Sequence, residues 1–467
     1  MHGRAICAAR PTPSTIRHIC PWRRGSGLSS EVNLWRASSR EHFAAPPLAT
    51  SREVDLAVIG GGFTGLAAAL EARRHGASVC VLEAQTVGHG GSGRNVGLVN
   101  AGLWLPPEAV IARMGPTGGK RLIDTLAEAP QRVFDLIARE GIDCEATRNG
   151  TLHLAHAPAG LRDLQERYRQ GRAHGAPLRL LDAAETARRT GSRAFHGALF
   201  DPRAGTIQPL SYARGLARAA VRAGAEVHEQ SPVTGLQRAA GQWQVTSRGQ
   251  SLRARHVLVA TNAYHLGFHD PFAPQIVGVH YCQYATDPLP EPLRRSILAG
   301  GEGCWDTALV MSSFRLDQAG RLVIGGIGNG DGPAGRVHAA WAARKLARLF
   351  PDLAGLPFRH GWSGRIAMTG DHIPKIVAFG PQAYACFGYS GRGIGPGTVF
   401  GTQAARALLL DRPDLLPVDP LRQHREGFAG LRAAYYEAGA SAVHAIAAQG
   451  SVGARAGLPQ AGASSRA

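Results

Sequence analysis

A glycine-rich segment between two apolar runs constrains this chain more than any other feature. Residues 54–65 read Val-Asp-Leu-Ala-Val-Ile-Gly-Gly-Gly-Phe-Thr-Gly, and residues 78–83 read Ser-Val-Cys-Val-Leu-Glu. This order predicts a buried strand, a tight turn, a helix and a second strand ending at Glu83. Gly60, Gly62 and Gly65 would allow the turn, the approach of a pyrophosphate and close helix packing. The alternative is a chance turn, but the flanking elements favour a dinucleotide site with Glu83 on the ribose hydroxyls.

Two further glycine-rich loops are candidates for cofactor contact. In Gly90-Gly-Ser-Gly-Arg-Asn95, backbone N–H groups and Ser92 could lie along an anionic cofactor while Arg94 supplies charge. Residues 388–397 form a second glycine turn that opens a helix, whose N-terminus would stabilise negative charge. A flexible surface turn and a plain strand-to-helix connection are the structural alternatives.

The order of predicted elements indicates an α/β (α+β) chain of two domains. A Rossmann-like dinucleotide-binding domain would be assembled from the separated segments 53–105, 200–265 and 360–412. A mainly antiparallel sheet would form the substrate domain from residues 106–199 and 266–359. Residues 1–52 are expected to be a partly disordered extension, residues 413–449 a helical segment and residues 450–467 a disordered tail.

Composition narrows the range of partners. The net charge is +18, but only three of 52 basic residues are lysines and the arginines are scattered, which favours a solvated basic surface over a nucleic-acid site. Seven cysteines without CxxC spacing argue against a zinc or other metal site and against a disulfide framework. We therefore expect a cytoplasmic protein, with no apolar run long enough for a membrane span and with peripheral contact to the inner membrane left open.

Together these motifs resemble the FAD-dependent amino acid oxidase family over residues 53–412. Within the family the similarity is greatest to the branch that oxidises L-pipecolate. The residues that carry this similarity are Gly88–Trp104, Gly150–His153, Arg203–Ile207, Trp305–Thr307, Ser312–Arg315 and the tail segment Leu431–Gly439 with Ser441 and His444. The loop Ser92–Asn95 alone also resembles γ-glutamylputrescine oxidases, so it marks only the wider group.

The resemblance implies an extended, non-covalent FAD. Gly60, Gly62, Gly65 and Glu83 would hold the ADP half, and Ser92, Gly93, Arg94 and Asn95 would lie near the pyrophosphate and flavin. The resemblance also places Val233 at the adenine, Ala260 and Thr261 at the next crossing strand, and Gly391 and Gly393 beneath the pyrimidine edge of the flavin. Family members with covalent FAD carry a cysteine near residues 364–369, where this chain has none.

Four residues are the candidates for catalysis. The resemblance makes Arg315 the partner of a substrate carboxylate, which a guanidinium can hold through two parallel hydrogen bonds; a surface arginine is the alternative. Tyr281 and Gln283 alternate on a predicted strand and could share a face toward the flavin, although an edge strand fits the pattern equally. His372 lies in a segment that the resemblance places near the dimethylbenzene side of the flavin, and a structural histidine is the simpler interpretation.

The predicted activity is oxidation of the C–N bond of an amino or imino acid by hydride transfer to flavin N5. The favoured substrate is L-pipecolate, giving the cyclic imine in lysine degradation; the alternatives are γ-glutamylputrescine, sarcosine and an opine. A rival of another class is a non-catalytic FAD protein. No proton-accepting residue is evident. The strand at 322–324 lacks the lysine that oxygen-using relatives carry, so the acceptor would be oxygen or a quinone or electron-transfer partner.

Overall fold

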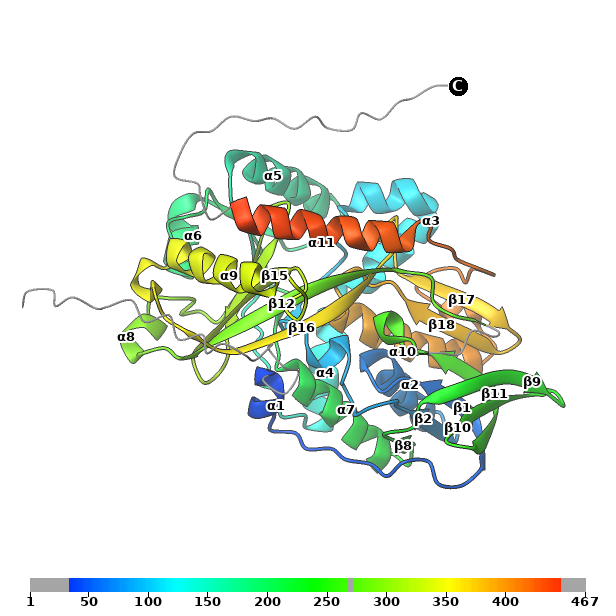
Figure 1. Cartoon of the computed structure of the whole chain (residues 1–467). Helices are drawn as coiled ribbons and strands as arrows, with labels where there is room; N and C mark the ends of the chain where they lie inside the picture. The colour runs from blue at the N-terminus through cyan, green and yellow to red at the C-terminus, as the bar shows by residue number, and fades with distance from the viewer. Residues whose placement is uncertain (1–32, 267–271, 447–467) are drawn as a thin grey trace, which may run out of the picture.

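The computed structural model describes residues 33–266 and 272–446, which form two large sheets flanked by helices (Figure 1). The first sheet has the order β17-β18-β11-β1-β2-β8, with a hairpin attached to β11. Its centre is parallel, as expected for strands joined by helical crossovers. The strands are β1 (Arg52–Ile59), β2 (Val79–Leu82), β8 (Glu226–His228), β9 (Val233–Ala239), β10 (Gln242–Ser247), β11 (Gln250–Val259), β17 (Lys375–Gly380) and β18 (Ala383–Phe387).

Five helices build the largest apolar core around this sheet: α2 (Phe63–Arg74), α3 (Pro107–Ala127), α4 (Ala129–Glu140), α7 (Pro209–Arg222) and α10 (Ile394–Leu409). Helix α2 is buried along almost its whole length because α7 and α10 pack against it. A Cβ atom on Gly401 of α10 would lie 2.0 Å from the carbonyl oxygen of Thr64. Glycine at this position therefore allows the two helix backbones to touch.

The second sheet has the order β16-β12-β15-β14-β13-β4-β6-β5 and is antiparallel except where β13 meets β4. The expected two-domain α/β architecture is thus confirmed. The strands are β4 (Thr151–Leu154), β5 (Arg179–Leu181), β6 (Ala198–Asp201), β12 (Val277–Pro288), β13 (Gly303–Asp306), β14 (Ser312–Leu316), β15 (Arg321–Ile327) and β16 (Phe358–Met368). The accompanying helices are α5 (Pro158–Ala173), α6 (Ala183–Thr190), α8 (Glu291–Arg294), α9 (Gly335–Leu349) and α11 (Ala429–Ile446).

Strands β3 (Leu98–Val99) and β7 (Gly205–Thr206) form a small separate ladder. Four short 3₁₀ helices complete the described elements: η2 (Gly91–Gly93), η3 (Asn262–Tyr264), η4 (Pro351–Leu353) and η5 (Pro413–Leu415).

Two expected domain boundaries differ from the structure. Strand β16 belongs to the second sheet, although it overlaps the segment expected to start the last part of the FAD-binding domain. Helices α3 and α4 pack on α10 in the core of the first sheet, not in the substrate domain. Which sheet these helices cover depends on contacts with distant segments of the chain.

The segment 33–52, expected to belong to a partly disordered extension, is ordered. Helix α1 (Leu34–Ser38) inserts Leu34 and Trp35, both fully buried, into a core with Trp362 of β16. The Trp35 indole nitrogen donates to the carbonyl of Asn95 at 2.8 Å. The expectations for residues 1–30 and 450–467 lie outside the described residues.

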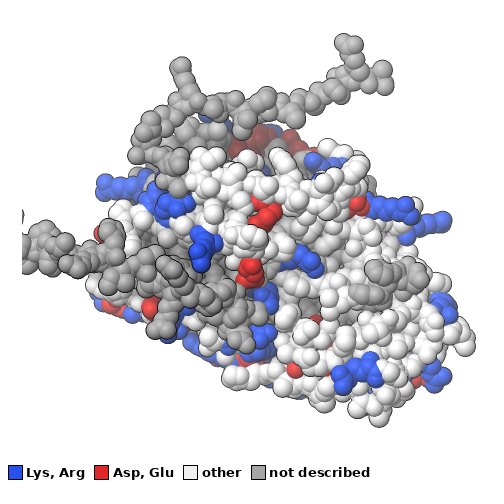
Figure 2. Space-filling view, in the orientation of Figure 1, with Lys and Arg blue, Asp and Glu red and all other residues white. Residues whose placement is uncertain are grey.

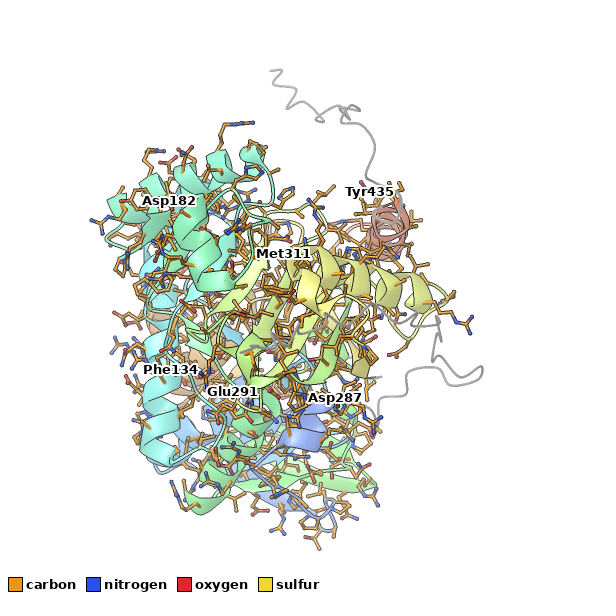
Figure 3. All side chains as sticks on the ribbon, turned by 90° about the vertical axis from the view of Figure 1, so that its left-hand side faces the viewer. Phe134, Asp182, Asp287, Glu291, Met311 and Tyr435 are labelled. Carbon is orange, nitrogen blue, oxygen red and sulfur yellow. The ribbon has the colours of Figure 1, made fainter. Side chains whose placement is uncertain are left out.

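Helix α11 covers the outer side of the second domain beside β12 and α9. Its buried His444 stacks on Trp341, with ring centroids 3.8 Å apart, and the Glu437 carboxylate accepts a hydrogen bond from the backbone nitrogen of Asn329. Tyr435 projects from the opposite side of the helix into solvent, as Figure 3 shows. One side of α11 therefore packs against the second domain, and the other side is exposed to solvent.

Basic side chains are scattered over the face in Figure 2 without forming a stripe, as expected for a solvated surface. Within the described part of the chain, no helix combines the length and apolar character that crossing a bilayer requires.

We predict that Trp35→Ala lowers the free energy of unfolding by about 3–5 kcal/mol, because it removes a fully buried aromatic side chain and its hydrogen bond. Urea unfolding followed by circular dichroism would measure the change. Leu431→Ala is the control, because Leu431 is 71% exposed. Equal stability of the two variants would contradict a structural role for α1.

Candidate cofactor and substrate site

A cavity of about 760 Å³ runs from the carboxyl end of β1 to the second sheet. Its first wall is the glycine turn between β1 and α2. Gly60 has φ +112°, and a Cβ atom there would lie 2.9 Å from the carbonyl oxygen of Ala260. A Cβ atom on Gly65 would lie 2.0 Å from the carbonyl oxygen of Gly60, so glycine is required for α2 to begin this close to the strand. Gly62, the N-cap of α2, lines the cavity.

Glu83 lies at the end of β2 and lines the same part of the cavity. Its two carboxylate oxygens accept hydrogen bonds from the backbone nitrogens of Gly61 at 2.8 Å and Gln85 at 2.9 Å. Burial raises the pKa of this carboxyl, while the two backbone hydrogen bonds act in the opposite direction. Each oxygen keeps a second lone pair, so the carboxylate can accept from the two hydroxyls of a ribose.

The loop at residues 90–95 contains η2 and lies against the start of α2. Ser92 and Asn95 line the cavity, and the Ser92 hydroxyl accepts a hydrogen bond from the backbone nitrogen of Phe63. Gly93 and Arg94 do not line it. The Arg94 guanidinium donates to the carbonyls of His89 and Ser363 and ties the loop to β16. The expected role of Arg94 as a charge facing the cofactor is therefore corrected to a structural one.

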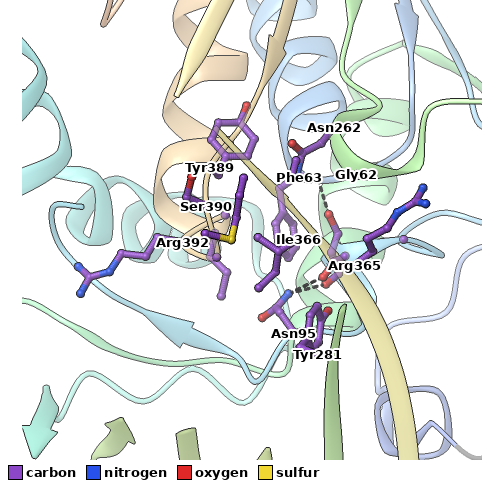
Figure 4. Close-up of a pocket in the computed structure, with 18 of the residues that line it drawn as sticks. Gly62, Phe63, Asn95, Asn262, Tyr281, Arg365, Ile366, Tyr389, Ser390 and Arg392 are labelled. Carbon is purple, nitrogen blue, oxygen red and sulfur yellow. Dashed lines mark hydrogen bonds between the residues drawn. The ribbon is translucent and has the colours of Figure 1, made fainter. Parts of the chain in front are cut away.

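The other walls come from distant segments. Val233, Ala260 and Thr261 line the cavity beside the glycine turn, and Gly391 and Gly393 line it where α10 begins. Gly391 has φ +90°, a conformation that favours glycine. Figure 4 shows Tyr389 and Ser390 of this second turn facing Ile366 of β16 across the cavity. The two glycine turns thus meet in space although more than 300 residues separate them in the chain.

Tyr281 and Gln283 of β12 line the end of the cavity formed by the second sheet, on one face as predicted. The Tyr281 hydroxyl and the Gln283 side-chain oxygen are buried and have no hydrogen-bond partner among the described residues. Burial raises the pKa of Tyr281 well above its usual value, so the phenol remains neutral. His372 also lines the cavity, has φ +58° and has its pKa lowered by burial.

Arg315 does not reach the cavity. It is 1% exposed, and its guanidinium donates to the carbonyls of Ile207 and Leu316 and lies over the ring of Trp35. Burial lowers its pKa to about 10. We therefore correct its predicted role: Arg315 connects β14 to the N-terminal segment and does not face a substrate. Strand alternation could not reveal this, because it leaves open which sheet face meets the cavity.

Arg392 does line the cavity at this end, and sequence reasoning missed it. Its guanidinium lies beside two neighbouring indoles, 5.1 Å from the ring centroid of Trp104 and 4.7 Å from that of Trp305. Figure 4 shows the side chain leaving the turn on the side away from Arg365. One nitrogen donates to the carbonyl of Ala101 at 2.7 Å, and Nε has no partner. Within the described residues no carboxylate pairs with it, and burial lowers its pKa to about 9.

Three further aromatic residues line the cavity beside Arg392: Trp104, His153 and Trp305. In the sequence they belong to the segments that carry the family resemblance, and no site role was predicted for them. His153 stacks on Trp305 with centroids 3.4 Å apart. The signal that could have identified Arg392 is its position inside the second glycine turn, where a long cationic side chain has no role in the turn itself.

These features define a two-domain oxidoreductase that binds an adenine dinucleotide between a parallel and an antiparallel sheet. A family model described as "FAD dependent oxidoreductase" (DAO) matches residues 55–407, and the chain belongs to this family. It is an oxidoreductase acting on amines or amino acids with FAD as cofactor and a separate electron acceptor.

Curated relatives cover most of the chain. A probable oxidoreductase, OrdL, of Haemophilus influenzae is 30% identical over 80% of this chain and 87% of its own length. The γ-glutamylputrescine oxidoreductase of Escherichia coli K12 is 31% identical over 86% of this chain and 96% of its own. The structure of glycine oxidase from Geobacillus kaustophilus superposes with a TM-score of 0.65 at 21% identity, covering 80% of this chain and 99% of that one.

The residues of the cavity fit FAD. The space left by the missing Cβ atom of Gly60, the α2 N-terminus and the carboxylate of Glu83 suit a pyrophosphate and ribose. No cysteine is among the residues that line the cavity in the described ranges.

We predict that Glu83→Gln weakens FAD binding about tenfold or more, because a charged hydrogen-bond acceptor is worth about 1.5–3 kcal/mol. Titration of the FAD-free protein with FAD, followed by flavin fluorescence, would measure the dissociation constant. Glu53→Gln, an exposed exchange on β1, is the control and should leave FAD affinity unchanged. Equal affinity of the Glu83 variant and the parent would rule out the ribose contact.

We predict that Arg315→Met lowers the free energy of unfolding by about 1–3 kcal/mol, because buried carbonyls such as that of Ile207 lose their donor. The KM for an amino acid substrate should stay within about twofold of the parent value, since the side chain lies outside the cavity. Chemical unfolding and steady-state kinetics test the two parts. A tenfold rise in KM without loss of stability would restore the substrate role.

Proposed function

We propose that this protein oxidises the C–N bond of an amino or imino acid, with L-pipecolate as the favoured substrate and the cyclic imine as product. FAD, when bound, supplies the chemistry by accepting a hydride from the carbon next to the substrate nitrogen. The chain's own contribution is to bind the carboxylate, orient the C–H bond, keep the amine neutral and exclude water.

The observation that carries the proposal is Arg392. A guanidinium held in a cavity beside Trp104 and Trp305, with no acidic ion-pair partner among the described residues, is costly, and its lowered pKa reflects that cost. An anionic ligand would offset the cost through charge-assisted hydrogen bonds to the unpartnered Nε. A carboxylate on the same small ring as the carbon that is oxidised would place that carbon at a fixed distance from the arginine.

Aromatic walls support a small cyclic substrate. The indole nitrogens of Trp104 and Trp305 are buried and have no hydrogen-bond partner in residues 33–266 and 272–446, so both can donate to a ligand. Their rings meet edge to face, with centroids 5.0 Å apart, and present flat apolar surfaces to the cavity. A six-membered ring carrying one carboxylate suits such a combination of flat walls and donors.

The same arginine helps to keep the substrate nitrogen neutral, as C–H cleavage requires. Arg392 and the neighbouring Arg167 place positive charge near the amine, which lowers the amine pKa. Nearby carboxylates do not cancel this effect fully: Asp163 pairs with Arg167 at 2.7 Å, and Asp306 pairs with Lys345 at 2.7 Å. A neutral amine would then bind without a dedicated base.

γ-Glutamylputrescine is the second candidate substrate, favoured by the 31% identical relative that carries that name. A side cavity of about 140 Å³ shares His153, Trp305 and Arg392 with the main cavity and would give a longer molecule room. In this substrate the carboxylate lies far from the oxidised amine. Sarcosine and opines remain further possibilities. The missing lysine on β15 supports a quinone or electron-transfer protein over oxygen as acceptor.

We predict that Arg392→Ala raises the KM for L-pipecolate about 10- to 150-fold, corresponding to about 1.5–3 kcal/mol for a lost charged contact. Anaerobic flavin reduction at increasing concentrations of L-pipecolate, D-pipecolate, proline, sarcosine and γ-glutamylputrescine would measure this. The control is Arg162→Ala, an exposed arginine of α5, which should leave KM unchanged.

A rise of less than threefold for every amino acid tested would reject the carboxylate contact. Reduction by γ-glutamylputrescine alone would replace pipecolate with the second candidate. Absence of reduction by every amine would favour the non-catalytic FAD protein.

A further inference from the structure

Three potential metal ligands meet at the edge of the first sheet, outside the main cavity. Cys80 of β2 and Glu226 of β8 are partners in the parallel ladder, and His228 lies two residues farther along β8. The Cys80 sulfur, a Glu226 carboxylate oxygen and a His228 ring nitrogen all lie within 4.8 Å of one another. From this geometry we propose a binding site for a divalent cation of the zinc class.

The state of the His228 ring is the decisive observation. Its Nδ1 lies 3.0 Å from the carbonyl oxygen of Pro46, which can only accept, so Nδ1 carries a hydrogen. Nε2 is then the atom with the lone pair; it is buried, and no hydrogen-bond donor from the described part of the chain reaches it. A backbone carbonyl that holds one ring nitrogen of a histidine while the other faces outward is the usual support of a metal-binding histidine.

The Glu226 carboxylate, which faces Nε2 of His228, also supports a metal site here. The nearest Glu226 oxygen lies 3.5 Å away, so a lone pair and a carboxylate point toward one another. This contact is repulsive unless a cation lies between the two groups or a second proton sits on the ring. A bound metal ion removes the repulsion and uses the buried Cys80 sulfur as well.

Thiolate, imidazole and carboxylate together favour zinc over calcium or magnesium, which prefer oxygen ligands. At zinc bond lengths of about 2.0–2.3 Å, ligand atoms of a tetrahedral site lie about 3.4–3.7 Å apart. Moderate movement of the three side chains reaches that spacing. The fourth position would be taken by water on the side of Glu226, which is partly exposed.

Arg52 is the other charged group at the site. Its guanidinium donates to both oxygens of Glu226, at 2.9 Å and 3.3 Å, with both side chains partly exposed. This contact orients the carboxylate and leaves further lone pairs on its oxygens for a cation. Binding would release the Cys80 thiol proton to solvent as the sulfur–metal bond forms, so zinc affinity would increase with pH.

The site would stabilise the weakest edge of the cofactor domain. Strand β8 has three residues and lies at the end of the sheet. The backbone nitrogen of Glu83 donates to the carbonyl of His228 at 2.9 Å, so the ribose-binding residue depends on the position of this strand. A cation linking β2 to β8 would hold that connection in place.

Equilibrium dialysis of the FAD-loaded full-length protein against Zn²⁺, after treatment with a chelator, tests the proposal. We expect one zinc ion per chain, and X-ray absorption at the zinc edge should show one sulfur ligand at about 2.3 Å. Cys80→Ala and His228→Asn should each weaken binding more than tenfold; asparagine keeps a donor toward Pro46 but lacks Nε2. Cys386→Ala, a buried cysteine of β18, is the matched control and should bind zinc like the parent.

Glu226→Gln changes only a partly exposed side chain and should also weaken zinc binding more than tenfold, which guards against loss through misfolding of the core variants. Bound zinc should raise the Tm of the parent by a few degrees and leave that of His228→Asn unchanged. The proposal is overturned if no zinc binds, if bound zinc has no sulfur ligand, or if the Cys386 variant loses zinc equally. These readouts do not involve substrate oxidation.

Discussion

The contact between α2 and β1 at the first glycine turn is the constraint on which the site depends. The Gly65 backbone lies so close to the Gly60 carbonyl that no side chain fits between them. This contact points the N-terminus of α2 into the cavity and places it opposite Glu83 at the end of the adjacent strand. Gly401 allows the same kind of contact between α10 and α2, which brings the second glycine turn to the same place. Two backbone contacts therefore determine where a dinucleotide can lie.

Uncompensated positive charge is the second organising feature. Arg315 and Arg392 both lack an acidic ion-pair partner among the described residues, and they differ in what surrounds them. The Arg315 guanidinium donates hydrogen bonds to backbone carbonyls, so its positive charge is stabilised by the protein itself. Arg392 has an unpartnered nitrogen and two indole faces beside a cavity, so its charge is available to a ligand. A residue's type and burial alone do not distinguish these situations; the hydrogen-bond partners do.

Much of the cofactor half of the site could be predicted from sequence. Gly60, Gly62 and Glu83 line the cavity because their roles follow from local spacing within one βαβ unit. The substrate half was predicted less well, since Tyr281 and Gln283 line the cavity but Arg315 does not. Alternation on a strand shows that two residues share a face, whereas the identity of that face is set by packing against segments far away in the chain, here Trp35 and Ile207.

The sequence alone determined the strand–turn–helix unit, the family and the cofactor, because the close backbone contacts at Gly60 and Gly65 leave no room for a side chain. Only the tertiary structure decided that Arg392 and not Arg315 lines the cavity, that Trp35 belongs to the core, and that Cys80 meets Glu226 and His228 across about 146 positions of chain. The reason is that strand pairing brings distant residues together. A rule based on short spacing, such as CxxC, cannot detect ligands that meet only after β8 has paired with β2.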